Sequence, residues 1–351
     1  MTTLPPIDTP YLIDFLSKLL NAPSPTGFCE PAISLTEQTL KAFPFLSLVR
    51  TRKGALVARW QGQKDDAPRA LTAHVDTLGA MVKEIKGDGR LKLTKVGHFA
   101  WNTVEGEGCT VFASKGRQVR GAILLDHASA HVYGGEVNEA KRDDDNMEVR
   151  LDARAKSEFE TRDLGIEVGD FVAFDPRVEV TAGFVRSRHL DDKAGVATLV
   201  AAVKALGDSG LKPTQTTYLH ISNFEEVGHG GAAGIPPEVH ELVTVDMAAV
   251  GDGQASDEFH ATLCVKDSGG PYHHGLSTRL RELARKHDIP FVVDIYPYYG
   301  SDGEAFLRAG GDVAVALIGP GVDASHSYER THTEALVATT KWILAYLLED
   351  N

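Results

Sequence analysis

Cysteine is scarce in this sequence, and an excess of basic charge is absent. Three cysteines occur among 351 residues, Cys29, Cys109 and Cys264, and none forms a CxxC pair. Their odd number and wide spacing argue against a disulfide framework and a thiolate metal site, and favour a reducing cytoplasm. The formal net charge is -13. We therefore expect no nucleic-acid or anionic-membrane partner, because both require basic patches.

Long apolar runs are also missing. No apolar stretch approaches the length that spans a membrane, and the opening residues MTTLPPIDTP lack the basic segment that begins a secretion signal. We therefore expect a cytoplasmic protein that does not bind membranes. The sequence does have length and apolar content, since 351 residues at 42% hydrophobic composition predict one large domain and a smaller one.

Helical and extended patterns alternate through most of the chain. Apolar residues at helical spacing cover residues 11–20, 29–43, 194–206, 277–287, 303–310 and 333–349. Short apolar runs typical of strands cover residues 54–60, 69–76, 216–222, 241–247, 291–297 and 313–319. The run RALTAHVD is typical of a strand that is buried on both faces. This alternation predicts an α/β protein with a three-layer α/β/α domain.

The residue pattern of the sequence changes between Asp76 and Asp191. Glycine-punctuated β-like runs such as GCTVFAS, GRQVRGAILL and VGDFVAFD follow one another there without intervening helices. Strands at this spacing predict a small β-rich domain inserted into the α/β domain. We therefore expect residues 1–77 and 187–351 to form the larger domain and residues 78–186 to form the insertion.

Acidic and imidazole side chains stand where the expected strands end or a helix begins. They are His74 and Asp76 in TAHVDTLG, Asp191 in HLDDKAG, Glu225 and Glu226 in FEEVGHGG, Asp246 in VTVDM, and His326 in DASHSYE. In open α/β sheets, ligands collect at the carboxyl ends of strands, so these residues can meet there. Imidazole and carboxylate without cysteine suit divalent zinc, cobalt or manganese.

Each of these features alone has an ordinary structural explanation. A histidine at a strand end is more often a satisfied core residue, Asp192 can simply cap the following helix, and an isolated acidic pair is usually solvated. Two adjacent carboxylates near an interior are nevertheless costly without protons, metal ions or hydrogen-bond donors. Their joint occurrence in this order favours an active site.

Several longer motifs resemble those of one peptidase family. AHVDTLG, LDDKAG, FEEVGHGGA, VTVDM and GSDGEAFLRAGGDVAVALIGPG are similar to the successive motifs of the M42 metallo-aminopeptidases, glutamyl aminopeptidase-like members of the co-catalytic zinc peptidase clan. Flanking segments such as PSPTG and LGIEVGDFVAFD also match. The resemblance therefore covers nearly the whole chain.

The resemblance implies a role for each motif residue. One divalent metal ion would be held by His74, Asp191 and Asp246, and a second by Asp191, Glu226 and His326, so that Asp191 bridges the two. Glu225 would be the general base for a hydroxide that bridges the ions, and would later pass the proton to the leaving amine. Asp76 would orient the imidazole of His74.

Two departures from the family pattern concern the first and last motifs. Thr77 stands where the family commonly has an acidic residue after the aspartate of the first motif. The last motif, SHSYERTHTE, is looser than the family's His-Ser-Pro-x-Glu, and both His326 and His332 could supply the ligand. We favour His326, because its distance from the preceding strand matches the family's spacing.

The expected activity is removal of N-terminal residues from short peptides. A second possibility is hydrolysis of an amide bond in a modified peptide or an N-acylated amino acid, because related di-metal folds also support deacylation. A glycosidase is disfavoured, because its two carboxylates must flank a bond from opposite sides. An inactive metal-binding scaffold is the non-enzymatic alternative, and Glu225, which is not needed as a ligand, argues against it.

The resemblance also implies self-association. Members of the family form dimers that build tetrahedral, dodecameric cages, and such cages admit only short, unfolded peptides. We therefore expect a homo-oligomer in which the inserted domain, 78–186, supports assembly.

Overall fold

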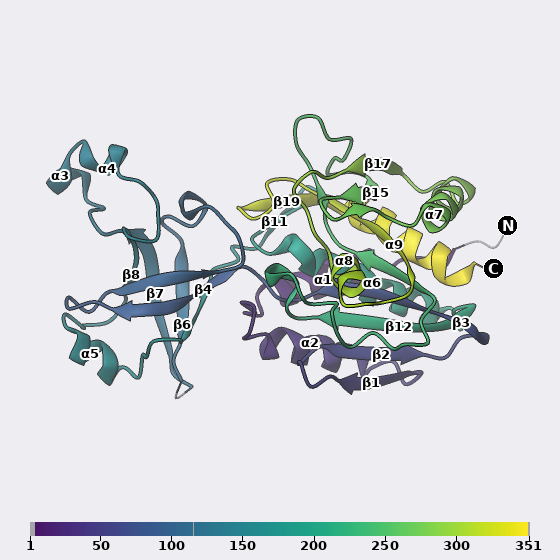
Figure 1. Cartoon of the computed structure of the whole chain (residues 1–351), viewed down its shortest axis with the longest axis horizontal. Coiled ribbons are helices and arrows are strands. Elements are labelled where there is room, and N and C mark those ends of the chain that lie inside the picture. The colour runs from purple at the N-terminus through teal and green to yellow at the C-terminus, as the bar shows by residue number, and fades with distance from the viewer. Residues whose placement is uncertain (1–3, 115, 350–351) are drawn as a thin grey trace.

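The chain forms a larger α/β body and a smaller β body that are joined side by side. The computed structural model describes residues 4–114 and 116–349. Figure 1 shows the larger body on the right and the smaller one on the left, and both chain ends lie on the larger body. Within those residues, no helix is both long and apolar enough to cross a membrane. The α/β class expected from the alternating sequence pattern is confirmed.

A ten-stranded mixed sheet forms the centre of the larger body. Its main path runs in the order β1 (Leu46–Arg50), β2 (Leu56–Trp60), β12 (Gln215–Ser222), β3 (Lys64–His74), β13 (Glu241–Val245), β18 (Ala314–Val322), β15 (Ala261–Asp267) and β16 (Gly270–Pro271). Two further strands lie off this path: β14 (Ala248–Ala249) pairs with β18, and β17 (Phe291–Ile295) pairs with β15. The four central strands β12, β3, β13 and β18 are mutually parallel, so their carboxyl ends meet at one edge.

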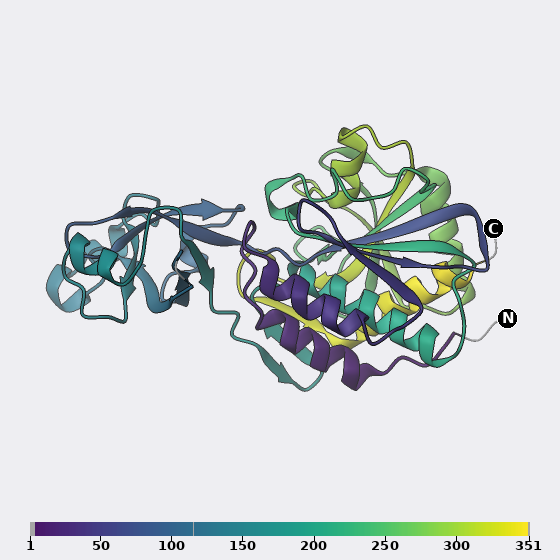
Figure 2. The same ribbon diagram turned by 90° about the horizontal axis from the view of Figure 1, so that it is seen from below.

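Helices cover both faces of this sheet. One face carries α1 (Thr9–Leu20), α2 (Glu30–Leu40), α6 (Leu190–Asp208), α7 (His274–Lys286) and α9 (Thr333–Leu348). The other face carries the short helix α8 (Asp302–Arg308) and several loops. In Figure 2, α1, α2 and α6 lie below the strands of the sheet.

The central strands alternate between the two cores, as strands buried on both faces must. In β18, Ala316 and Ile318 pack with the larger helical layer, whereas Val315 and Leu317 pack on the opposite face. Because both faces of such a strand are buried, its residues form a continuous apolar run in the sequence. The sheet therefore lies between two apolar layers, and the loops that carry the site begin where its strands end.

The smaller body is a closed six-stranded barrel. Its strands follow the order β4 (Gly79–Ile85), β5 (Leu91–Val96), β8 (Met147–Leu151), β7 (Gln118–Leu125), β6 (Gly108–Phe112) and β9 (Phe171–Phe174), and β9 pairs back with β4. The barrel encloses its own apolar core, which includes Val111, Ile123 and Val149. A separate core indicates a unit that is stabilised independently of the large sheet.

A third, three-stranded sheet connects the two bodies. It consists of β10 (Glu179–Thr181), β11 (Phe184–Ser187) and β19 (Glu329–His332), and β11 pairs with β19 across a long sequence separation. The chain therefore leaves the barrel after β9 and rejoins the larger body before α6.

The expectation that no helices interrupt the β-rich segment is wrong in detail. Among the described residues of this segment, three short helices occur in its loops: α3 (Ala130–Tyr133), α4 (Glu136–Glu139) and α5 (Glu158–Asp163). Two single-turn 3-10 helices also occur, η1 (Trp101–Thr103) in this segment and η2 (Glu225–Val227) in the larger body. Helices of one or two turns are too short to produce a recognisable apolar period, which explains why the sequence pattern does not reveal them.

Candidate metal centre

The sequence-predicted site residues come together at the carboxyl edge of the large sheet. His74 ends β3, the pair Glu225 and Glu226 follows β12 in η2, and Asp246 directly follows β13. Asp191 lies at the start of α6. His326 reaches the same edge from the loop between β18 and β19. Residues up to 172 positions apart in the sequence, such as His74 and Asp246, are thus neighbours, because parallel strands end at a common edge.

Asp191 lies at the centre of two groups of potential ligands. The ligand atoms of His74, Asp191 and Asp246 all lie within 4.8 Å of one another, and so do those of Asp191, Glu226 and His326. Asp191 Oδ1 is 3.2 Å from His74 Nε2, whereas Asp191 Oδ2 is 3.3 Å from His326 Nε2. Each oxygen of this carboxylate therefore faces a different group.

The site concentrates acidic groups that are withdrawn from water. Asp191 and Asp246 are 8% and 3% exposed. Burial, together with the charge of Asp191, raises the pKa of Asp246 to about 7. Burial also raises the pKa of Glu226 to about 8 and that of Glu225 well above its usual range. Carboxylates in this setting are stabilised when a cation lies among them.

Two imidazoles partly offset these acids. Burial alone would raise the pKa of Asp191, but hydrogen bonds with His326 and His74 lower it below its usual range. The opposite holds for His326, where burial alone would lower the pKa, and the acids Asp191 and Glu226 raise it to about 10. Four acids face two imidazoles here, and the donors are nitrogen and oxygen only. This donor set and its excess of negative charge fit divalent cations such as zinc.

Asp76 connects the first group to the loop that carries the two glutamates. Its main-chain oxygen lies 3.0 Å from His74 Nδ1, and its Oδ1 lies 3.4 Å from the same nitrogen. Its carboxylate also accepts hydrogen bonds from the main-chain N–H groups of Glu225 (3.1 Å) and Glu226 (3.2 Å) and from the hydroxyl of Thr26 (2.8 Å). A single buried carboxylate therefore holds both parts of the site.

Two acids that the sequence analysis did not assign to the site also hold its parts in place. Glu329 accepts hydrogen bonds from the main-chain N–H groups of Asp191 and His326, both at 3.0 Å. Asp192 accepts from the N–H of His74 at 3.2 Å, and also from Gly195 at 3.1 Å, as expected of a helix cap. The sequence feature that could have indicated a role for Glu329 at the site is the His-x-x-Glu spacing in HSYE.

The two candidate histidines of the last motif have different surroundings. His326 Nε2 lies 3.3 Å from Asp191 and 3.5 Å from Glu226. His332 instead caps α9, where its Nδ1 accepts from the N–H of Glu334 at 3.2 Å, and its ring packs against Phe184 with centroids 4.8 Å apart. Only His326 of this pair is placed among the acids.

A cavity of about 360 Å³ opens beside the acidic groups. It is lined by Asp191, Glu225, Glu226, Gly228, Asp246, Met247, Ala249, Tyr298, Tyr299, Gly300, Ser325 and His326. The cavity therefore gives a small substrate direct access to both groups of potential ligands and to Glu225.

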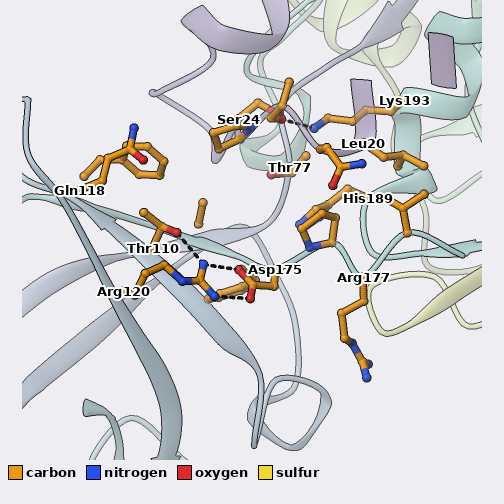
Figure 3. A pocket seen from close by; sticks show the side chains of 18 residues that line it. Leu20, Ser24, Thr77, Thr110, Gln118, Arg120, Asp175, Arg177, His189 and Lys193 are labelled. Carbon is orange, nitrogen blue, oxygen red and sulfur yellow. Dashed lines mark hydrogen bonds and ion pairs between the residues drawn. The ribbon is translucent and has the colours of Figure 1, made fainter. Parts of the chain in front are cut away.

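A second cavity of about 480 Å³ lies between the two bodies, as Figure 3 shows. Lys193 lines it and donates a hydrogen bond to the main-chain oxygen of Ala22 at 2.7 Å. Arg120 and Asp175 form a two-pronged ion pair in the same cavity. These charged groups are already bonded within the chain, so the cavity beside Asp191 is the candidate active site.

Comparison with known proteins assigns the chain to a family. The M42 glutamyl aminopeptidase family profile matches residues 54–342. YhfE of Bacillus subtilis (strain 168) is 48% identical over 336 residues, which cover 95% of this chain and 96% of that protein. A lysyl aminopeptidase of Pyrococcus furiosus is 26% identical over 310 residues, 85% of each chain.

The fold agrees with this assignment. The TET1 peptidase of Pyrococcus horikoshii superposes with a TM-score of 0.83 at 22% identity, over 97% of this chain and 100% of the other. The chain therefore belongs to the M42 glutamyl aminopeptidase family, whose members are metal-dependent, and it is an aminopeptidase.

Proposed function

We propose that this aminopeptidase uses two divalent metal ions to remove N-terminal residues from short peptides. The observation that carries the proposal is the position of Asp191, whose two oxygens face two separate groups of ligand atoms. His74, Asp191 and Asp246 would hold one ion, and Asp191, Glu226 and His326 the other. Three carboxylates would then offset most of four positive charges, which makes close cations tolerable.

Zinc suits this donor set best, and cobalt and manganese are also compatible with imidazole and carboxylate ligands. When bound, such ions polarise the scissile carbonyl and acidify the attacking water. The remaining steps fall to the chain's own residues.

Glu225 is the proposed proton carrier. Its Oε2 lies 3.7 Å from His74 Nε2, and its side chain lines the cavity without belonging to either ligand group. Burial raises its pKa, so the carboxylate can take a proton from the attacking water and hold it until the leaving amine accepts it. Asp76 fixes the loop that carries Glu225 and so aims this group.

Activity on free amino groups tests the proposed reaction. The enzyme, loaded with zinc, cobalt or manganese, should hydrolyse aminoacyl amides and leave their N-acetylated counterparts intact, because the free amine is the group that the acidic site recognises. Elemental analysis of the same samples should give two ions per chain. Faster cleavage of the N-acetylated compounds would instead identify a deacylase.

We also propose that residues 78–186 support assembly into a homo-oligomer in the cytoplasm. The TET1 peptidase of Pyrococcus horikoshii can assemble into a tetrahedron or a large octahedral shell. The smaller body exposes large apolar side chains on its short helices, Val132 in α3 and Phe159 in α5, each 72% exposed. Cys29, Cys109 and Cys264 are buried free thiols, which suits a reducing compartment. Light scattering at micromolar concentration tests assembly, and a strict monomer would contradict it.

A further inference from the structure

The cavity beside the acidic groups has a wall that the proposed reaction does not use. Met247 and Ala249 form part of this wall after β13, and Tyr298, Tyr299 and Gly300 form another part after β17. Met247 is 2% exposed, and Tyr298 is 96% exposed at the rim. The hydroxyl of Tyr299 already donates to the main-chain oxygen of Met247 at 2.8 Å. The wall is therefore formed by uncharged groups.

A positively charged partner for an acidic substrate side chain is missing from this cavity. Of the described residues, those that line it include no lysine or arginine. Two basic side chains bond the neighbouring loops but line other parts of the molecule: Lys53 donates to the main-chain oxygen of Gly230 at 3.0 Å, and Arg188 donates to that of Ser327 at 3.1 Å. Arg188 is also paired with Glu107 at 3.0 Å. Outside the proposed metal ligands and Glu225, a glutamate side chain in the cavity would meet only uncharged groups.

A negatively charged partner for a basic substrate side chain is also not available. The acids that line the cavity are Asp191, Glu225, Glu226 and Asp246. In the proposed function, three of them hold metal ions and Glu225 carries a proton. A lysine side chain would compete with those ions for the same oxygens. Burying a charge without a partner is unfavourable for either sign.

We infer that the enzyme prefers an uncharged, apolar N-terminal side chain, such as that of leucine, methionine or phenylalanine. The preference rests on the proposed function and identifies its substrate class. It also separates this chain from the acidic residue in the family's name and from the lysyl specificity in the name of its Pyrococcus furiosus relative. The side chain would pack against Ala249, Tyr298 and Tyr299, where contact with apolar atoms supplies the binding energy.

Two measurements on the metal-loaded enzyme test this inference. Leucyl substrates should exceed glutamyl and lysyl substrates by about 100-fold or more in kcat/KM, since the charged side chains lose hydration without gaining a partner. Calorimetry with the hydroxamates of leucine, glutamate and lysine should give the same order of affinity without requiring turnover.

Paired variants at the wall sharpen the test. Ala249→Lys should raise the glutamyl-to-leucyl ratio of kcat/KM by about tenfold over that of Ala249→Met, because the two new side chains have similar length and differ in charge. Tyr298→Lys and Tyr298→Met repeat the comparison at an exposed position, where folding is not at risk.

The outcomes separate this inference from the proposed function. If aminoacyl substrates are cleaved but glutamyl or lysyl compounds match leucyl ones, the inference is wrong and the aminopeptidase reaction stands. If neither lysine variant changes the ratio relative to its methionine control, the wall does not bind the side chain and the inference is also overturned. If only N-acetylated compounds are cleaved, the proposed function itself fails.

Discussion

Two buried acids, one in the barrel and one in the candidate metal centre, are equally withdrawn from water but have different partners. Glu148 in β8 and Asp246 after β13 are each 3% exposed. Glu148 pairs with Lys86 at 2.5 Å and with Arg90. Asp246 instead lies near the carboxylate of Asp191, and its pKa is raised to about 7 by burial and by that charge. A buried acid with basic partners has its charge balanced within the fold, so that removing one partner is destabilising, whereas a buried acid among other acids indicates a site for a cation.

The largest expected effect is on turnover and lies within the acidic cluster. Glu225→Gln should lower kcat by about 10²- to 10⁴-fold, because it removes the proton carrier. It should retain both metal ions, since Glu225 belongs to neither ligand group. Glu158→Gln, in the exposed helix α5, is the control. Near-normal kcat in the Glu225 variant would show that this acid is not the general base.

The next effect concerns metal content. Asp191→Asn should lower the content of both ions, because each oxygen of Asp191 faces one group. Asp246→Asn and Glu226→Gln should each mainly affect one ion. Elemental analysis after dialysis distinguishes these cases, and an Asp191 variant that keeps two ions would refute the bridging role.

The two histidines near β19 give a matched pair. His326→Ala should lose one ion and most activity, because its Nε2 faces Asp191 and Glu226. His332→Ala should retain both ions and lose about 1 kcal/mol of stability as a missing helix cap. Bound metal and the free energy of unfolding are measured for both. Loss of metal in the His332 variant alone would show that His332, and not His326, is the ligand.

The pH dependence of the metal-free enzyme distinguishes the two regions further. The folded-state pKa values of Glu226 (about 8) and Asp246 (about 7) lie above the roughly 4 of free carboxyl groups. Between about pH 4 and pH 8, the native state therefore holds more protons than the unfolded state. The free energy of unfolding should therefore fall as pH rises from about 5 to 8. Zinc should remove much of this fall. Urea unfolding at both pH values, with and without zinc, measures it, and a flat metal-free profile would contradict the prediction.

The smallest expected effect on metal binding and turnover comes from the barrel. Glu148→Gln leaves Lys86 and Arg90, both partly exposed, without their acid, and should lower the free energy of unfolding by about 1–3 kcal/mol. Metal content and kcat should not change. A loss of metal in this variant would break the distinction between structural and cation-binding acids.

The sequence predicted which residues would gather at the candidate site because they follow regular elements. His74, Glu225 and Asp246 each stand at or just after a strand whose apolar run is visible in the sequence, and parallel strands bring their carboxyl ends together. Glu329 and Asp192 were missed as supports. Their carboxylate oxygens accept hydrogen bonds from main-chain N–H groups far away in the sequence. The N–H of Asp191, for example, lies 138 residues from Glu329. The His-x-x-Glu spacing indicates the contact of Glu329 with His326, but no local pattern encodes a contact between segments this far apart.

The sequence by itself determined the alternation of helices and strands, the β-rich insertion and the order of the ligand-type residues. Those features depend on local periodicity and residue type, which the chain carries wherever it folds. Only the tertiary structure decided that the two oxygens of Asp191 face different groups, that Asp76 joins His74 to the glutamate loop, and that His326 rather than His332 lies among the acids. These are distances between remote segments, and the packing of the sheet, its helices and the loop before β19 sets them.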